Sequence, residues 1–383
     1  MVGLGLIGAA ALRHLAAGRR CVGIGPAEPA EWSTHRGVFA SHYDSGRITR
    51  RLDKQREWAV LAGRSIGSYA GIEAASGITF HHPVGVLIAE VDPARLATTI
   101  AVAEGLGVEF ETCNPGSPFG DDRVALPGAA TVLRERAPGG FIDPRRMLAA
   151  QLAVATGSGA RVLAEQAAGI ERRSAGGWLV RTTDGSTVQA EQVVIATGPH
   201  ADELDGLPRR PCIDVVAETT VLAEVSAGEL QRLVGLPSII VDDPAQDHLY
   251  SVPPTRYPDG GMYIKLGATH RDERVLSPTE RRAWMTGDQH VADLDWLRDL
   301  LLGLLPGLQA DAWLTRPCLI PDTPTKLPYL EIVDRGFVMA VGGNGYAAKS
   351  ADAIGALAAG LVIDRRWTDT ELDEQSFRLI DRD

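Results

Sequence analysis

Three glycines near the start of the chain have the spacing of a nucleotide-binding turn. Gly3, Gly5 and Gly8 form the pattern Gly-x-Gly-x-x-Gly, and the small residues at 9–17 favour a helix directly after it. In such a turn the first glycine allows a tight bend, the second lets the backbone approach a pyrophosphate, and the third lets the helix pack closely. The helix N-terminus then offers its amides to the anion. The motif predicts dinucleotide binding, with a fortuitous glycine-rich turn as the alternative.

Two features around this turn depart from the usual pattern. Only Met1 and Val2 precede Gly3, whereas a central strand has about five residues. We expect either a start that lies upstream or a sheet without a full middle strand. A carboxylate for the ribose is expected about 20 residues after the last glycine. The nearest acid after the strand 21–24 is Glu28, which is a ribose ligand or a solvated loop carboxylate.

The elements along the chain must bring distant segments to this turn. Helices are expected over about 53–76 and from Asp143, which suits the N-cap position before a proline at the first helical position. The strand at 192–196 ends in Ala-Thr-Gly, so that Thr197 and Gly198 are placed for close backbone approach to a nucleotide. These alternating strands and helices predict an α/β fold.

The second half of the chain changes in character. Residues 211–310 hold β-rich runs and one amphipathic helix, which indicates a separate lobe. The tail returns to a strand at 337–341, a glycine turn and a small-residue helix. A hairpin is expected over 79–89. It contains His81 and His82, but neighbours on a strand point to opposite faces, so we predict no metal site there.

Composition narrows the class of protein. The net charge of −11 gives no basic footprint for nucleic acid or an anionic membrane. Four cysteines without a Cys-x-x-Cys pair indicate neither zinc nor a disulfide framework, which predicts a reducing, cytoplasmic setting. No apolar run reaches the length of about 18 residues that a membrane span needs, and the apolar start lacks the basic region of a signal peptide.

The glycine turn, the Ala-Thr-Gly strand end and the final Gly-Gly-Asn-Gly turn recur in this order in a known group of proteins. The chain resembles, over essentially its whole length, the D-amino-acid-oxidase-like flavoprotein superfamily, and within it the monomeric sarcosine oxidase, N-methyltryptophan oxidase and pipecolate oxidase branch. The resemblance implies a Rossmann-like FAD-binding domain of the glutathione-reductase type with a second, β-rich substrate domain. The expected FAD-binding pieces are 1–80, 140–210 and 311–383, and the expected substrate-domain pieces are 81–139 and 211–310.

The segment 41–50 resembles the part of that branch that lies along the flavin and ends in Arg-x-x-Arg. The resemblance places Ser41, His42 and Arg47 near the flavin and assigns the substrate carboxylate to Arg50. A guanidinium suits this task because it grips a carboxylate with two parallel hydrogen bonds and so fixes which C–H faces the flavin. The alternative is a solvated basic strand.

Two strands of the second lobe carry further candidates by resemblance. Lys265 stands in a Lys-Leu-Gly sequence similar to the family's Lys-Ile-Gly strand, whose lysine promotes the reaction of reduced flavin with oxygen. A fixed ammonium in a dry site would stabilise developing superoxide charge; an edge-strand lysine that discourages aggregation is the alternative. Tyr250 matches an aromatic residue of the substrate cavity, or is a core tyrosine.

Cys318 lies in a stretch that resembles the one bearing the cysteine that forms a thioether to FAD in this branch. The match departs from the family at Pro321, and an isolated cysteine is also a common small buried hydrophobe. The amide-rich start of the last helix would face the pyrimidine edge of the flavin. Ala347 occupies the place of the family's second carboxylate-binding lysine, and Lys349 follows two residues later. The substrate carboxylate is then held differently, or the substrate lacks one. The residues assigned to cofactor binding at this turn and helix start are Gly342, Gly343, Asn344, Gly345, Tyr346 and Lys349.

The resemblance implies an enzyme that oxidises the C–N bond of a small, secondary amino acid or amine to an imine, with FAD as cofactor and oxygen as the acceptor. The flavin is expected to be covalent if Cys318 keeps the family's role. Two alternatives stay open from the residues. One is a dehydrogenase or hydroxy-acid oxidoreductase with another acceptor, and the other is a non-catalytic dinucleotide-binding protein.

Overall fold

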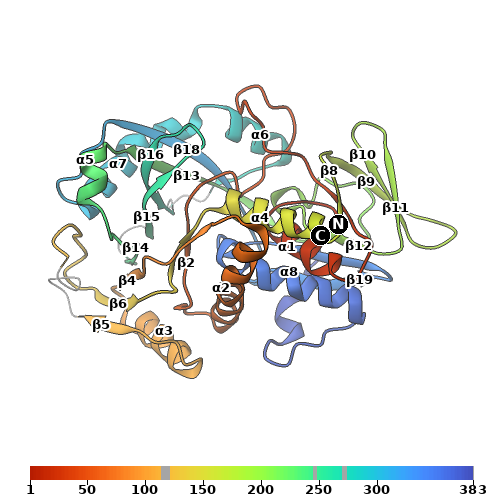
Figure 1. Cartoon of the computed structure of the whole chain (residues 1–383), viewed down its shortest axis with the longest axis horizontal. Coiled ribbons are helices and arrows are strands. Elements are labelled where there is room, and N and C mark those ends of the chain that lie inside the picture. The colour runs from red at the N-terminus through yellow and green to blue at the C-terminus, as the bar shows by residue number, and fades with distance from the viewer. Residues whose placement is uncertain (114–120, 245–247, 270–273, 383) are drawn as a thin grey trace.

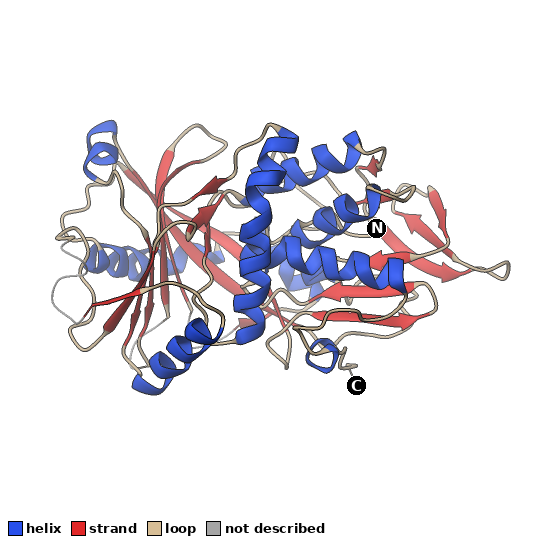
Figure 2. Cartoon of the chain, turned by 60° about the horizontal axis from the view of Figure 1, so that its bottom comes forward, coloured by secondary structure: helices blue, strands red, loops and turns tan. Residues whose placement is uncertain are grey.

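The computed structural model describes residues 1–113, 121–244, 248–269 and 274–382. Most of the long helices and a small sheet gather in one half of the molecule, and a large twisted sheet occupies the other half (Figure 1 and Figure 2). The chain passes between the two halves several times, so that each half is assembled from separate segments.

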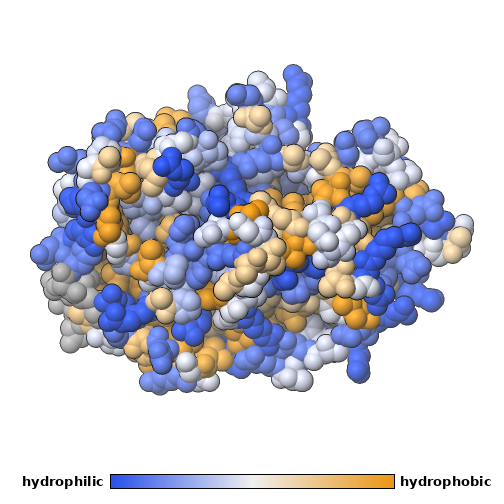
Figure 3. All heavy atoms as spheres, viewed as in Figure 1, coloured by the Kyte–Doolittle hydropathy of each residue, from blue (hydrophilic) through white to orange (hydrophobic). Residues whose placement is uncertain are grey.

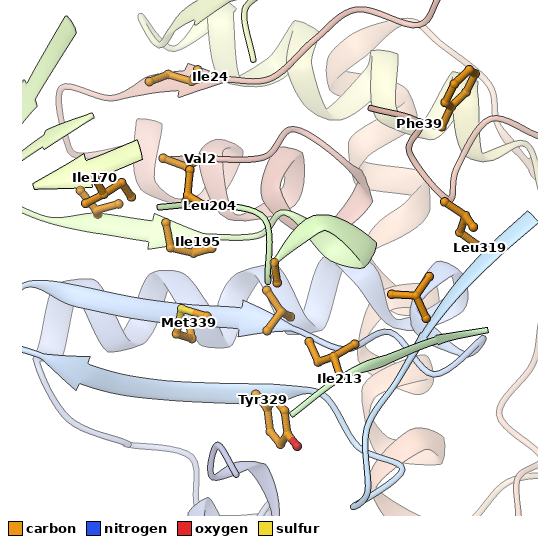
Figure 4. Close-up of a cluster of buried hydrophobic side chains, with 14 of the residues drawn as sticks. Val2, Ile24, Phe39, Ile170, Ile195, Leu204, Ile213, Leu319, Tyr329 and Met339 are labelled. Atoms are coloured by element: carbon orange, nitrogen blue, oxygen red, sulfur yellow. The ribbon is translucent and has the colours of Figure 1, made fainter. Parts of the chain in front are cut away.

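The half that contains the N-terminus is built on a small sheet. Its strands are β1 (Val22–Ile24), β8 (Arg161–Leu163), β12 (Val193–Ile195), β19 (Tyr329–Asp334) and β20 (Phe337–Val341). β1 pairs with β8 and β12 with β20, both in parallel, and β19 is antiparallel to β20. Val2 bridges Ile24 on one pair and Ile195 on the other, as Figure 4 shows. The middle of this sheet therefore consists of isolated bridges at Val2 and not of a full strand.

Four helices pack beside this sheet: α1 (Leu6–Ala16), α2 (Arg56–Ser76), α4 (Pro144–Gly157) and α8 (Ala347–Asp364). α1 and α8 approach closely because small residues meet, and a Cβ on Gly355 would lie 2.6 Å from the Cβ of Ala10. α4 begins as predicted. Pro144 takes its first position, and the Asp143 side chain accepts a hydrogen bond from the backbone N–H of Arg146 at 3.0 Å.

One buried carboxylate ties the four helices together. Asp352 of α8 accepts hydrogen bonds from Arg13 of α1 at 2.6 Å, from Ser68 of α2 at 2.6 Å and from Gln151 of α4 at 3.0 Å. Burial works against the charged form, but the His14 and Arg13 side chains outweigh it and hold the pKa of Asp352 well below its usual range. Charge-assisted bonds of this kind make Asp352 a cross-link of the helical layer.

Two smaller antiparallel sheets flank this core. One consists of β9 (Ala167–Arg172), β10 (Trp178–Thr182) and β11 (Thr187–Ala190). The other consists of β2 (Arg47–Thr49), β7 (Gly140–Ile142) and β3 (His81–His82), with β7 in the middle. The second of these sheets fixes the start of the predicted Arg-x-x-Arg segment.

The other half is a nine-stranded sheet. Its order is β17-β13-β16-β15-β14-β4-β6-β5, with β18 on the free edge of β13. The bounds are β4 (Val86–Glu90), β5 (Glu111–Cys113), β6 (Thr131–Glu135), β13 (Asp214–Glu224), β14 (Ser238–Asp242), β15 (Leu249–Arg256), β16 (Met262–Ala268), β17 (Arg274–Val275) and β18 (Ala312–Asp322).

Shorter helices accompany this sheet. They are α3 (Pro93–Gly105), α5 (Ala227–Arg232), α6 (Pro278–Thr286) and α7 (Leu294–Leu304), with short 3-10 turns at Gly198–His200, Gln289–Asp293 and Glu374–Phe377. The amphipathic helix predicted in this half is α7. Its residues Leu297, Leu301 and Leu304 are buried in one apolar cluster with Ile264 and Leu266 of β16, which leaves the opposite face of the sheet for the first half of the molecule.

The strand partners of β3, β4 and β18 bear on two of the expectations. The predicted hairpin at 79–89 is wrong, because β3 pairs with β7 whereas β4 lies between β14 and β6. Gly85, with φ of 84°, redirects the chain between two different sheets. β18 pairs with β13 along its whole length, although the prediction placed 311–383 in the FAD-binding domain. The division into domains otherwise stays a prediction.

The helices and the cysteines also bear on a membrane span and on disulfide bonds. None of the helices within the described residues is long and apolar enough to cross a membrane. Cys21, Cys212 and Cys318 are free thiols, and each is partly accessible.

Candidate active site

A cavity of about 530 Å³ lies between the glycine turn and the large sheet. It collects most of the residues that the sequence singles out from six separate segments. Those in its wall are Gly3, Gly5, Ser41, His42, Arg47, Arg50, Thr197, Gly198, Tyr250, Cys318, Gly342, Gly343, Asn344, Gly345, Tyr346 and Lys349. Figure 3, which faces the same way as Figure 1, shows apolar and polar residues mixed over this face of the molecule.

Gly3 and Gly8 of the first turn are each required by a different close contact with the backbone. A Cβ on Gly3, whose φ is 90°, would lie 2.3 Å from the carbonyl oxygen of Ala196 at the end of β12. A Cβ on Gly8 would lie 1.9 Å from the carbonyl oxygen of Gly3. Gly8 therefore packs α1 against the turn and does not itself face the cavity. The first turn of α1 holds no acidic residue, so its amides stay available to an anion.

Buried polar atoms without partners point into the same space. Among the described residues, His42 Nδ1, Arg50 Nε and Thr197 Oγ1 are buried without a hydrogen-bond partner, and all three residues line the cavity. Burial, followed by the charges of Arg145 and Arg47, lowers the pKa of His42 to about 3, so its ring is neutral. A buried polar group left unpaired costs about 1–3 kcal/mol. The wall is thus built for a polar ligand with several acceptors and donors.

The Arg47 side chain links the loop after Ser41 to the large sheet. Its guanidinium forms an ion pair with Asp44, donates to the carbonyl oxygen of Ser41 at 3.3 Å, and approaches Cys318 Sγ to 3.4 Å. Burial raises the pKa of the Cys318 thiol, whereas the Arg47 charge acts in the opposite direction. Asp44 is a residue that sequence reasoning missed, although it lies three positions before Arg47.

Lys265 lies behind the wall of the cavity. Its side chain is 1% exposed, and its ammonium donates to Asp44 Oδ2 at 2.6 Å and to the carbonyl oxygen of Gly46. The ammonium also lies 5.4 Å from the centre of the Tyr250 ring. Burial first, and then the Arg47 charge, lower the pKa of Lys265 well below its ordinary value. The structure therefore brings Lys265 next to predicted site residues without exposing it to the cavity.

A second cationic group surrounds Arg50. Lys349 Nζ lies 2.5 Å from Asp53 Oδ2, and Arg50 Nη2 lies 3.4 Å from the same oxygen. Both cations also face the ring of Tyr346, at 5.1 Å for Lys349 and 5.7 Å for Arg50. Burial lowers the pKa of Lys349 to about 8, helped by Arg50 and opposed by Asp53. Lys349 thus reaches the neighbourhood of Arg50 although Ala347 occupies the expected position.

Sequence reasoning missed Asp53, and its role follows only from its contacts. Two cations and one carboxylate leave the group with one net positive charge beside the cavity, which suits a single substrate carboxylate. Tyr346 is itself fixed because its ring stacks on Trp58 of α2, with 5.4 Å between ring centres. The group is therefore held by β2, α2 and the start of α8 together.

The turn before α8 is shaped by hydrogen bonds. Asn344 has φ of 49°, and its side chain accepts from the backbone N–H of Thr323 at 2.7 Å and donates to the carbonyl oxygen of Gly342 at 2.8 Å. Asn344 therefore clamps the turn to the end of β18. The amides at the start of α8 meet the cavity as expected for an anion-binding or electron-rich partner.

Glu28 is the predicted residue that the structure does not bring to this site. It is not part of the cavity wall, and its carboxylate accepts from Arg145 of α4 at 2.7 Å. The strand β1 ends at Ile24, so Glu28 lies four positions beyond the strand end where a ribose ligand is usually placed. Its role as a ribose ligand stays a prediction without geometric support.

Comparison with known proteins agrees with this geometry. The model of the family described as "FAD dependent oxidoreductase" (DAO) matches residues 1–361. The chain belongs to this family. It is accordingly an FAD-dependent oxidoreductase. A search of curated proteins gave no match.

Solved structures show the same fold at low sequence identity. NikD, described as an unusual amino acid oxidase essential for nikkomycin biosynthesis, is 21% identical with a TM-score of 0.74, covering 99% of this chain and 96% of that one. Glycine oxidase from Geobacillus kaustophilus is 22% identical with a TM-score of 0.73, covering 99% and 97%. L-proline dehydrogenase from P. horikoshii is 17% identical with a TM-score of 0.70, covering 98% and 95%.

Proposed function

We propose that this chain is an FAD-dependent oxidase of a small amino acid, one in which the reacting nitrogen is a secondary or primary amine. The C–N bond of the substrate is oxidised to an imine, and oxygen is reduced to hydrogen peroxide. The observation that carries the proposal is the buried guanidinium of Arg50, which shares one cavity with the glycine turn and has an unpartnered Nε. The substrate carboxylate and the cofactor then meet in the same space.

The residues of the cavity fit FAD. The amides of the Gly3–Gly5 turn and the start of α1 suit a pyrophosphate, and the unpartnered His42 Nδ1 and Thr197 Oγ1 supply further polar contacts. When bound, FAD would supply the two-electron redox chemistry that links the substrate to an electron acceptor. Cys318, whose thiol borders the cavity beside Arg47, is the proposed site of covalent attachment.

The remaining residues of the site orient the substrate. Arg50 and Lys349 hold the carboxylate, and Tyr250 limits the cavity from the large sheet. This fixes the substrate carbon that is to be oxidised relative to the cofactor, which is the main source of rate in such a reaction. The amine reacts in its neutral form, because only that form has a free electron pair on nitrogen. The similarity to the solved structures of NikD, an amino acid oxidase, and of glycine oxidase supports this substrate class.

A dehydrogenase that uses another electron acceptor is the second candidate. The observation that favours it is the position of Lys265. Its Nζ donates hydrogen bonds to Asp44 and to the carbonyl oxygen of Gly46 and does not point into the cavity. One of the similar structures is named a proline dehydrogenase. In the oxidase proposal Lys265 promotes the reaction with oxygen; in the dehydrogenase proposal it stabilises the loop around Asp44.

The test begins with the visible spectrum of the purified protein and acid precipitation. Yellow colour that stays in the pellet, and moves to the supernatant in Cys318→Ala, supports the covalent flavin. Anaerobic bleaching by amino acids, followed by peroxide on admission of air, supports the oxidase. Bleaching without peroxide, and reoxidation unchanged in Lys265→Met, would favour the dehydrogenase. A protein that stays colourless after added FAD contradicts both.

A further inference from the structure

One carboxylate of the cavity has no part in the function proposed above. Glu218 on β13 lines the cavity together with Tyr250 and Cys318. A second carboxylate in the wall, Glu203, forms an ion pair with Arg281 at 3.0 Å and lies 2.7 Å from Nδ1 of His200. No residue among those that the structure describes forms an ion pair with Glu218. An anionic group is thus presented to the ligand space beside a site that already binds an anion.

The large sheet holds Glu218 in a defined place. Glu218 is directly opposite Cys318 in the antiparallel pairing of β13 with β18, so both side chains lie on the same face. Tyr250 on β15 is opposite Gly267 on β16, and a Cβ on Gly267 would lie 2.2 Å from Cζ of the tyrosine ring. The missing side chain at Gly267 lets the Tyr250 ring lie across β16. Its hydroxyl then donates to Glu218 Oε1 at 2.5 Å.

This hydrogen bond aims the carboxylate and leaves acceptor positions open on it. A carboxylate has two oxygens with about four acceptor positions, and Tyr250 occupies one of them. Two cations near Glu218, Arg47 and Lys265, form their ion pairs with Asp44 and not with Glu218, although the Glu218 charge acts on both of them. Glu218 therefore keeps acceptor positions for a ligand.

The reacting amine is a poor partner for Glu218. A negative charge beside an amine favours its protonated form, which has no free electron pair for oxidation. The substrate carboxylate is equally unsuitable, since like charges repel, and it belongs with Arg50 and Lys349. A positively charged group of the substrate that takes no part in the reaction is the partner that a carboxylate binds most strongly.

We infer that Glu218 and Tyr250 form a cation-binding subsite, and that the substrate is an amino acid with a second, non-reacting basic nitrogen. The inference rests on the proposed function and names its substrate class. The Arg50 group holds the carboxylate at one wall of the cavity, and the Glu218 carboxylate holds the distal ammonium or guanidinium at the face of the large sheet. The fit of a diamino acid depends on its length, because its carboxylate must reach Arg50 while its distal cation reaches Glu218.

The test uses the FAD-loaded protein and three diamino acids: 2,4-diaminobutyrate, ornithine and lysine. Each is paired with the isostere in which a methyl group replaces the distal ammonium: norvaline, norleucine and 2-aminoheptanoate. Dissociation constants are measured anaerobically from the shift of the flavin absorbance, which needs no turnover. At least one diamino acid is expected to bind about tenfold or more tightly than its isostere, as for a hydrogen-bonded charge.

Glu218→Gln is expected to abolish this preference while leaving the isosteres unaffected. Glu224→Gln, on the same strand but outside the cavity wall, is the matched control and should retain the preference. In Glu218→Asp the charge retreats by one methylene group, so the preferred ligand should become one methylene longer. This variant keeps the test decisive if Glu218→Gln does not fold.

Three results would overturn the inference. Equal affinity for diamino acids and isosteres in the unaltered protein contradicts the cation subsite, as does a preference that survives Glu218→Gln. Equal weakening of both ligand types in Glu218→Gln would instead place Glu218 at the reacting amine. Failure of the proposed function looks different, because then no flavin binds or no amine bleaches it.

Discussion

Replacing Arg50 with methionine is expected to separate binding of the substrate carboxylate from the rest of the site. Methionine retains much of the arginine length but neither its charge nor its five N–H donors. The Arg50 side chain is 11% exposed, so a carboxylate bound to it is largely withdrawn from water. The Asp53 carboxylate keeps its stronger partner, Lys349 at 2.5 Å, and the local structure should survive the change.

The magnitude follows from the contacts that are lost. Hydrogen bonds to charged groups contribute about 1.5–3 kcal/mol, which corresponds to roughly ten- to a hundredfold in kcat/KM for a substrate with a carboxylate. Lys349 remains and keeps part of the attraction, so a total loss of binding is not expected. For an amine without the carboxylate, Arg50→Met should change kcat/KM by less than about threefold, since that ligand never used the guanidinium.

The assay is anaerobic flavin reduction followed by stopped-flow absorbance, with an amino acid and the amine obtained from it by decarboxylation. Arg51→Met is the matched control, because Arg51 directs its side chain to Glu135 and does not line the cavity. Equal losses for both substrates in Arg50→Met would show that the residue supports the fold of the site rather than the carboxylate. An unchanged rate for the amino acid would refute the role of Arg50 altogether.

Two further predictions concern buried charges. Because burial lowers the pKa of Lys349 to about 8, its ammonium is present below that pH and lost above it; KM for a carboxylate substrate should rise above about pH 8, and Lys349→Met should remove this limb of the KM profile. Persistence of the same limb in the variant would contradict the assignment. Asp352→Asn should lower the free energy of unfolding by about 3–5 kcal/mol, as for a broken buried ion pair, and is measured by urea denaturation. Since the pKa of Asp352 is depressed in the folded protein, its contribution is present at neutral pH and is lost as the pH falls below the ordinary carboxyl range; a pH-independent difference between the two proteins would be inconsistent with it.

Prediction succeeded for elements whose signal is local. α4 could be placed from Asp143 and Pro144 because an N-cap acts within one turn of helix. The glycine turn could be interpreted because backbone atoms close to Gly3 and Gly8 leave no room for a Cβ at either position. The hairpin at 79–89 failed since β3 and β4 belong to different sheets, and pairing partners far along the chain leave no local mark.

The sequence by itself determined the nucleotide turn and the order of the main elements, and most of the residues that it singled out lie in the cavity wall, because these features depend on residue type at short spacing. Only the tertiary structure decided which charges meet. Lys265 is held by Asp44, Lys349 by Asp53, and Glu218 is aimed by Tyr250 across Gly267. These contacts join residues up to several hundred positions apart. Their geometry depends on strand register and helix packing, which no local pattern encodes.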